Sequence, residues 1–268
     1  MPRLVTFNSW KCDGDYHARL PLMIEGLARL DADVIALQEC FRAPEIDADT
    51  ARNVAAALDM ELAHTPARRE SRVVDGAEVS SSSGLAVLSR TPIERVEVIR
   101  LPEDPRDGER IAQFVWTTLG TLPMLVVNLH LCYLPDAGEL RRRQLEAVLA
   151  ERGRLAPRIP AALLGDFNAA ATDPELGPLR ALASIQWGTS DLAALPPTNG
   201  GVHHAPRAVD HMVLLPAVGD ADPGRGALTL RRRAPALTEP DAHGVRPSDH
   251  AAVVADLEVS PTSRVPGS

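Results

Sequence analysis

Five apolar runs in this sequence carry an acid, an amide or a histidine at one end, and these polar residues are the ones best suited to do chemistry. The runs, such as LVTFN and VIALQE, are typical of buried strands. The polar residues at their ends are Asn8, Glu39, His130, Asp166, Asn168, Asp249 and His250. Each of them alone is explained as well by a strand-end cap or a turn. The same arrangement at five strands favours one shared site, because loops beyond strand ends converge on one rim of an α/β sheet.

The residue types in this set match one kind of chemistry. Carboxylate and neutral amide oxygens are hard ligands that suit Mg²⁺ or Mn²⁺, ions that use few protein ligands and keep several waters. Phosphoryl transfer needs little more than charge neutralisation, a positioned water and donors toward the developing negative charge. A histidine supplies such a donor, and a carboxylate partner fixes its tautomer. The set therefore predicts metal-assisted hydrolysis of a phosphoester.

The elements that must position these residues alternate strands with helices at first and include hairpins further along the chain. The predicted strands are 3–9, 33–38, 84–89, 93–100, 111–119, 124–131, 161–164, 209–215 and 251–259, and the predicted helices are 17–30, 48–58 and 138–155. Long polar loops are expected at 68–83, 102–110 and 195–207. This order fits a pair of mixed sheets flanked by helices better than a purely parallel sheet.

Charge and composition narrow the choice of substrates. The 268 residues carry a formal net charge of −8, which disfavours a protein that grips long nucleic acid, since a basic face supplies most of that affinity. Lys11 is the only lysine, and the bias toward arginine is explained better by composition than by phosphate binding. The sequence has no apolar run of about 18 residues and no apolar signal region, and its cysteines lack CxxC spacing. A cytoplasmic protein without a disulfide framework or a zinc site is expected.

Seven short motifs together resemble the endonuclease/exonuclease/phosphatase superfamily, which includes DNase I-like nucleases, apurinic endonucleases, inositol-polyphosphate phosphatases and sphingomyelinases. The motifs are TFN at 6–8, LQE at 37–39, SGLAVLSR at 83–90, NLHL at 128–131, GDFN at 165–168, VDHMVL at 209–214 and SDH at 248–250. They follow the family's order over 3–258, and GDFN with a terminal SDH is the specific combination. The resemblance implies an α/β fold of the four-layer α/β/β/α type, with two packed mixed sheets between helices. It implies a single catalytic domain over 1–259 and a flexible tail at 260–268.

The resemblance also implies roles for individual residues. The implied ligands of Mg²⁺ or Mn²⁺ are Glu39, as the principal one, Asn8 and Asp249. The implied catalytic residues are His130, Asp166, Asn168, Asp210 and His250. In this scheme Asp166 positions or deprotonates the attacking water, and His250, paired with Asp210, faces the scissile phosphate. Substrate contacts are implied for Arg110, Asn168 and His130, the last at a position where apurinic endonucleases carry tyrosine.

Three functions stay open on the sequence alone. An enzyme acting on a small or lipid-like phosphoester is favoured, because the chain is acidic and lacks a basic, aromatic insertion for DNA. A DNA or RNA endonuclease or exonuclease is the alternative. A non-catalytic binding protein on the same fold is disfavoured, because none of the expected site residues is lost. For Cys12, Cys40, Cys132, His203 and His204, packing or a solvated loop is favoured over a role at a metal or substrate. A role in substrate binding and plain surface charge are equally good interpretations of Arg68, Arg69, Arg72, Arg106 and Arg207.

Overall fold

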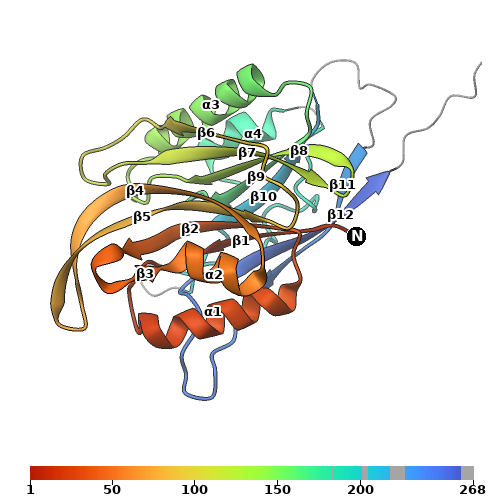
Figure 1. Cartoon of the computed structure of the whole chain (residues 1–268). Helices are drawn as coiled ribbons and strands as arrows, with labels where there is room; N and C mark the ends of the chain where they lie inside the picture. The colour runs from red at the N-terminus through yellow and green to blue at the C-terminus, as the bar shows by residue number, and fades with distance from the viewer. Residues whose placement is uncertain (183, 201–204, 218–226, 261–268) are drawn as a thin grey trace, which may run out of the picture.

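Two β-sheets pack face to face, and helices cover the outer face of each (Figure 1). The computed structural model of the chain describes residues 1–182, 184–200, 205–217 and 227–260. One apolar core lies between the two sheets. A second core lies between one sheet and its helices, and a third lies between the other sheet and its helices. These four layers are the α/β/β/α sandwich that the resemblance implied, and both sheets are mixed, as predicted.

The first sheet has seven strands, in the order β11-β12-β1-β2-β5-β4 with β3 paired to β2. Their bounds are β1 Arg3–Asn8, β2 Val34–Ala43, β3 Ala48–Asp49, β4 Glu61–Val74, β5 Ala77–Ser89, β11 Ala227–Ala236 and β12 Ala252–Ser260. Strands β1 and β2 are parallel, and the other described pairs of this sheet are antiparallel. Helices α1 (Tyr16–Leu30) and α2 (Thr50–Leu58) cover its outer face.

The second sheet has five strands, in the order β10-β9-β8-β7-β6. Their bounds are β6 Arg95–Arg100, β7 Ile111–Leu119, β8 Leu122–His130, β9 Ala161–Asp166 and β10 Asp210–Leu215. Strands β8 and β9 are parallel. Helices α3 (Gly138–Leu155) and α4 (Gly177–Arg180) cover its outer face, and 3₁₀ turns lie at η1 (Pro44–Ile46) and η2 (Pro174–Leu176).

Strand β1 shows how the sequence pattern builds these layers. Successive side chains of a strand point to opposite faces of its sheet. Leu4 accordingly packs between the two sheets, whereas Val5 and Phe7 pack against Met23 and Leu27 of α1. Because both faces of the strand are buried, its sequence is apolar almost throughout rather than alternating with polar residues.

The strands bring the predicted site residues to one edge of the sandwich. In the parallel pair β1–β2, Asn8 lies in register with Gln38. In the parallel pair β8–β9, His130 lies in register with Asp166, which pairs in turn with Asp210 at the start of antiparallel β10. The end of one strand therefore lies beside the end of the next, and polar residues distant in the sequence become neighbours.

Two buried amide side chains join the two sheets beside this edge. Gln38 Nε2 on β2 donates to Asn128 Oδ1 on β8 at 2.8 Å. Asn128 Nδ2 donates to the backbone oxygens of Leu37 at 2.9 Å and Ala86 at 3.0 Å, on β2 and β5. Both amides are fully buried, where a polar group is costly unless it is paired. This pair, Gln38 and Asn128, is called the amide clamp below, and it fixes the alignment of the sheets next to the site.

The prediction of a loop at 68–83 is wrong, because these residues belong to the long hairpin of β4 and β5. The two strands stay paired as far as Val74 and Ala77, on either side of a turn at Asp75 and Gly76. The hairpin's outer part is polar, as in RRES and SSSS. Its strands therefore lack the apolar alternation that marks a strand in a sequence, and their backbone hydrogen bonds to each other hold them instead. Strand β11 was also not predicted.

The end of the chain differs by one residue from the prediction. Ser260, predicted to begin the flexible tail, is the last residue of β12 and pairs with Ala227. Residues 261–268 lie outside the described residues. None of the helices in the described parts of the chain is both long and apolar enough to cross a membrane.

Replacing Asn128 with leucine tests the amide clamp. The change Asn128→Leu keeps the branched side-chain shape but removes the hydrogen bonds to the oxygens of Leu37 and Ala86 and the one from Gln38, whose amide still donates to Thr6 and Ala36. We expect the free energy of unfolding to fall by about 2–5 kcal/mol, as for other losses of a buried hydrogen-bond network. Urea denaturation followed by circular dichroism measures it.

The matched control is Asn53→Leu on α2. Asn53 is half-buried, and its side chain forms no hydrogen bond with the described residues. Its replacement should change the free energy of unfolding by less than about 0.5 kcal/mol. An equally small change for Asn128→Leu would contradict the role given to the clamp.

Candidate active site

One cavity collects eight of the nine residues to which a metal, catalytic or substrate role was attributed. Its volume is about 300 Å³. The eight residues that line it are Asn8, Glu39, Arg110, His130, Asp166, Asn168, Asp249 and His250. The ninth, Asp210, is fully buried and lies behind His250. The predicted residues therefore share a single place in the fold.

Asp210 and His250 form a hydrogen-bonded pair in the wall of this cavity. His250 Nδ1 lies 2.8 Å from Asp210 Oδ2. Burial by itself lowers the pKa of His250, but the charge and hydrogen bond of Asp210, aided by Asp166 and Asp249, raise this pKa well above its ordinary value. The backbone N–H of Asp210 donates to Thr198 Oγ1 at 3.0 Å, which holds the start of β10. His250 is therefore an imidazolium, and its Nε2 lies 3.9 Å from Asp166 Oδ2.

Asp166 lies at the centre of the polar groups in the cavity. Its Oδ2 accepts a hydrogen bond from Asn8 Nδ2 at 3.1 Å and lies 3.4 Å from His130 Nε2. Its Oδ1 accepts a hydrogen bond from the backbone N–H of Asn168 at 2.8 Å. Burial, together with the charge of Asp210, raises the pKa of Asp166 to about 7. A carboxyl group with this pKa exchanges its proton near neutral pH, as a general base must.

His130 differs from His250 in its charge. Burial, followed by the positive charges of Arg110 and Lys11, lowers the pKa of His130 well below its ordinary value. The ring is therefore neutral, and its Nε2 lies 3.9 Å from Glu39 Oε1. Two histidines of opposite character thus face one cavity, one able to donate a proton and one uncharged.

Local backbone geometry turns several of these side chains toward the cavity. Glu39 and Asn168 have the left-handed backbone conformation, with φ of +55° and +49°. This conformation is uncommon outside glycine and is found at sites where the surrounding structure imposes it. Gly165 has φ of +144°, and a Cβ there would lie 2.0 Å from the backbone oxygen of Leu129. Glycine permits this close approach of β9 to β8, which explains the first residue of GDFN.

The oxygen-rich side of the cavity fits a divalent cation. Glu39, Asp249 and the amide of Asn8 offer hard oxygen ligands there. Burial raises the pKa of Asp249, and the negative charge of Glu39 raises it further. A divalent cation would relieve this crowding of carboxylates. The tightest set of ligand atoms among the described residues, all within 4.8 Å of one another, belongs to Asp166, Asp210 and His250. Two of these residues already share a hydrogen bond, so the ligand set Asn8, Glu39 and Asp249 stays a prediction that the donor chemistry fits.

Arg19 was not among the predicted site residues, although it shapes the cavity. It is 2% exposed. Its guanidinium donates to five backbone oxygens, those of Ser9, Trp10, Lys11, Asp13 and Pro247. These bonds tie the loop at 9–13 to the segment that precedes Ser248. A sequence signal does exist, because Arg19 lies on the buried face of α1 with Tyr16 and Met23, and an arginine on such a stripe indicates a buried role.

Lys11 and Tyr133 also line the cavity without having been predicted to do so. Lys11 Nζ lies 3.7 Å from Glu39 Oε2, and the Arg110 guanidinium lies 5.9 Å from the centre of the Tyr133 ring. Both residues belong to loops. Their positions depend on contacts with other elements, which no periodicity in the sequence reports.

The remaining arginines of the predicted loops separate into two groups. Arg68 lines the cavity. The others do not line it: Arg69, Arg106 and Arg207 are exposed, and Arg72 forms an ion pair with Asp13 at the cavity's rim. An interpretation as surface charge or as structural ion pairs therefore suits the second group.

The cysteines and the paired histidines complete the comparison with the sequence. Cys40 and Cys132 are fully buried, and Cys12 is half-buried; all three pack in apolar clusters. This arrangement agrees with the packing role that was favoured for them. His203 and His204 lie outside the described residues.

The chain belongs to the Endonuclease/Exonuclease/phosphatase family, whose sequence model matches residues 5–250. A search of the curated proteins gave no match. The family match covers the motifs from the end of β1 to His250, so it includes every residue of the cavity described above.

Solved structures with the same fold match almost the whole chain. An endonuclease/exonuclease/phosphatase from Beutenbergia cavernae DSM 12333 has a TM-score of 0.74 and 22% identity, over 97% of this chain and 72% of that chain. TDP2 from D. rerio, in a complex with a single-strand DNA product, has a TM-score of 0.74 and 16% identity, over 96% and 98%. A mannosyl-6-phosphatase from Bacteroides thetaiotaomicron VPI-5482 has a TM-score of 0.67 and 17% identity, over 96% and 100%. At these identities the likeness establishes the fold.

Replacing Arg19 with methionine should loosen the loop at 9–13 while the rest of the chain stays folded. Cys12 is half-buried in that loop, so its thiol should react with Ellman's reagent at least about tenfold faster in Arg19→Met, which corresponds to about 1.4 kcal/mol of easier local opening. Cys40 and Cys132 are fully buried and should stay slow. Absorbance gives the rates, and mass spectrometry identifies the labelled cysteine.

The matched control is Arg29→Met, which removes an exposed arginine from the same helix and should leave the rate at Cys12 unchanged. Equal rates at Cys12 in Arg19→Met and in the unmodified protein would contradict the role of the guanidinium. Fast labelling of all three cysteines would mean global unfolding. In that case Arg19→Lys, which keeps the charge, should show a moderate increase at Cys12 alone.

Proposed function

We propose that this protein is a divalent-metal-dependent hydrolase of phosphoester bonds, in which water attacks the phosphorus in line with the leaving group. The observation that carries the proposal is the pairing of Asp166 and His250, a buried carboxyl group with a pKa of about 7 that lies 3.9 Å from an imidazolium. A base and an acid at this separation suit proton transfer around one reacting group. Family membership, and the phosphatase among the structural neighbours, support the same class of reaction.

Asn8, Glu39 and Asp249 would hold Mg²⁺ or Mn²⁺. The bound ion supplies positive charge that neutralises the phosphate and polarises its oxygens. The chain's own residues do the rest. Asp166, fixed by the amide of Asn8, accepts the proton of the attacking water. His250, held by its carboxylate partner at 2.8 Å, donates to the phosphate oxygens as negative charge grows on them. Contacts with the substrate are assigned to Arg110, Asn168 and His130.

A small or lipid-like phosphoester is the proposed substrate class. A cavity of about 300 Å³ has the size of small-molecule sites, and a net charge of −8 opposes a long polyanion. A DNA or RNA nuclease is the second candidate, because Arg68 lines the cavity and a structural neighbour was solved with a DNA product. A purely binding role has less support, since the acid, base and amide groups are all present. The cytoplasmic location stays a prediction.

Activity should depend on a divalent metal. The purified protein with Mg²⁺, assayed against plasmid DNA and against sugar, nucleotide and lipid phosphates, should hydrolyse at least one small ester, and EDTA should abolish turnover. Glu39→Gln should raise the Mg²⁺ concentration needed for half-maximal activity by at least about tenfold. Replacing a residue that only contacts a metal ligand already lowers metal affinity by that factor. The control Glu103→Gln changes an exposed carboxylate away from the cavity and should leave that Mg²⁺ concentration unchanged. Full turnover in EDTA by metal-free protein would refute the metal assignment, and turnover of plasmid alone would favour the nuclease.

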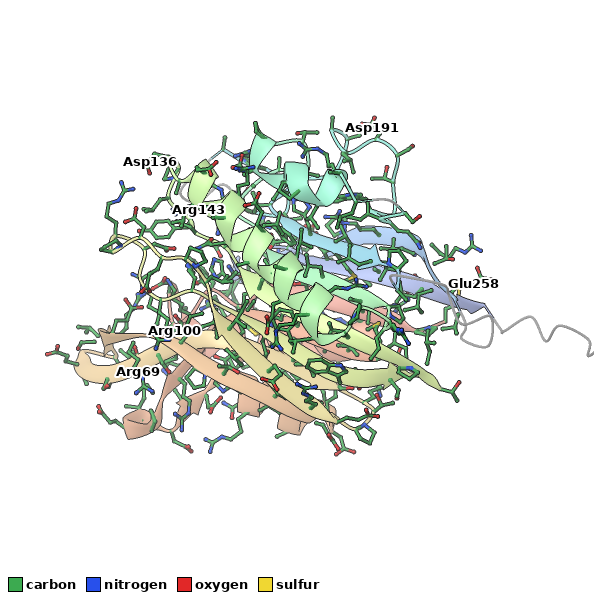
Figure 2. The ribbon with its side chains drawn as sticks, turned by 90° about the horizontal axis from the view of Figure 1, so that it is seen from above. Arg69, Arg100, Asp136, Arg143, Asp191 and Glu258 are labelled. Carbon is green, nitrogen blue, oxygen red and sulfur yellow. The ribbon has the colours of Figure 1, made fainter. Side chains whose placement is uncertain are left out.

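Removing the base or the acid should slow the chemical step. We expect Asp166→Asn and His250→Ala each to lower kcat by at least about 10²-fold. Asp210→Asn should cost less than His250→Ala, because its task is to orient that ring. The double variant should be no worse than His250→Ala if the pair acts as one unit. Asp191 is exposed at the molecule's periphery (Figure 2), so the control Asp191→Asn should leave kcat unchanged. A harmless Asp210→Asn would show that the pairing is not used.

A further inference from the structure

Three cations line the part of the cavity that adjoins a second, smaller pocket, which Asp166 and His250 do not line. They are Lys11, Arg68 and Arg110, called the cation wall below. With Glu39 and His130, the same three residues also line a smaller pocket of about 30 Å³ that continues from the cavity. The cations come from three separate parts of the chain: the loop after β1, strand β4 and the loop before β7. Their convergence is therefore a product of the fold.

Two strand irregularities aim side chains at this place. The register of β2 shifts between Leu37 and Cys40, around Glu39, and that of β4 shifts between Pro66 and Arg69, around Arg68. Strand β5 runs between them, and a Cβ at its Gly84 would lie 2.2 Å from the backbone oxygen of Thr65. Bulges of this kind re-aim a side chain, and they are common beside active sites. Arg68 consequently lines the cavity, whereas its neighbour Arg69 is exposed and lies near the edge of the molecule (Figure 2).

The donors of the cation wall are only partly used within the protein. Lys11 Nζ lies 3.7 Å from Glu39 Oε2 and Arg68 Nε lies 3.7 Å from Glu70 Oε2, distances too long for hydrogen bonds. Neither side chain donates a hydrogen bond to any described residue. Arg110 is buried and donates two hydrogen bonds to Asp107, so the position of its guanidinium is fixed. A metal ion bound to Glu39 would compete with Lys11 for that carboxylate, so the Lys11 ammonium would be more available to an anion.

The smaller pocket limits what can bind at the wall. Its other lining residues are Ser83, Gly84 and Glu109 and a buried apolar cluster of Ala67, Leu85 and Ile111. A water needs about 10–15 Å³ of such volume, so about 30 Å³ admits the terminal oxygens of an anion and not a nucleotide. The pocket therefore favours a small anionic group over a bulky one.

We propose that Lys11 and Arg68, backed by Arg110, form a second anion subsite that binds a second phosphate of the substrate. The favoured substrates are then small bisphosphates, with the scissile phosphate beside Asp166 and His250 and the other phosphate at the cation wall. This inference rests on the proposed function, and it deepens that function by naming a substrate class. After burial, the positive charges of Arg110 and Lys11 are the next causes that lower the pKa of His130.

Matched alkyl esters test the subsite without relying on any particular metabolite. The probes are alkyl monophosphates and the corresponding alkanediol bisphosphates of increasing spacer length, such as propyl phosphate and propanediol bisphosphate, at constant free Mg²⁺. For one spacer length or more, kcat/KM should be at least about tenfold higher for the bisphosphate, the scale of one hydrogen bond between charged groups. That ratio should fall toward one in Lys11→Met and in Arg68→Met. It should persist in the matched control Arg69→Met and return in Lys11→Arg.

A binding measurement separates this inference from the proposed function. Calorimetry on the Asp166→Asn variant with Mg²⁺ gives Kd values that need no turnover, and the bisphosphate should bind at least about tenfold tighter than the monophosphate. Adding Lys11→Met or Arg68→Met should remove this difference, and adding Arg69→Met should not. If no ester is hydrolysed but the difference in Kd persists, the hydrolase proposal fails and the subsite stands. Equal affinities at every spacer length, or tighter binding of a single-stranded oligonucleotide than of every bisphosphate, would overturn the subsite.

Discussion

The amide clamp is the contact on which the arrangement of the site depends. Gln38 and Asn128 are fully buried. A buried amide group that lacks hydrogen-bond partners destabilises the fold by more than one hydrogen bond stabilises it. The hydrogen bonds of Asn128 to Gln38, Leu37 and Ala86 form only when β8 lies across β2 and β5 in the observed alignment. Glu39 follows Gln38 directly and His130 lies two residues beyond Asn128, so this alignment sets the positions of both. A slide of one sheet over the other would break these hydrogen bonds and change the position of Glu39 relative to His130.

Charge is distributed unevenly around the cavity, and this division gives the site its chemistry. At one end, buried carboxylates crowd together, and the pKa of Asp166 rises to about 7 while its neighbour His250 becomes an imidazolium. At His130, burial and then the positive charges of Arg110 and Lys11 lower the pKa, so this ring stays neutral. Burial amplifies both effects, because charges interact more strongly where water is excluded. One protein surface thereby offers a base, an acid, an uncharged donor and a place for a cation.

The scaffold holds these groups with backbone conformations that a free chain rarely adopts. Trp10, Lys11, Glu39 and Asn168 all have positive φ, a conformation that persists only where surrounding contacts impose it. For the loop at 9–13 the contacts come mainly from the guanidinium of Arg19, which binds four carbonyl oxygens of that loop. For Glu39 the cause is the irregular register of β2 beside β5. Contacts within the protein thus hold the shape of the cavity, which lowers the cost of ordering it on binding.

The sequence by itself determined the sandwich and the polar strand ends. Apolar runs that close with Asn8, Glu39 and His130 report burial along one strand, and local periodicity is enough to detect it. Asp210 carries no such pattern and entered only through the resemblance to a family. Tertiary structure alone decided the rest: the β4–β5 hairpin, the buried role of Arg19, and the meeting of Lys11 with Arg68. These features depend on hydrogen bonds and charges contributed by distant strands and loops, and a pattern read along one segment contains no information about such partners.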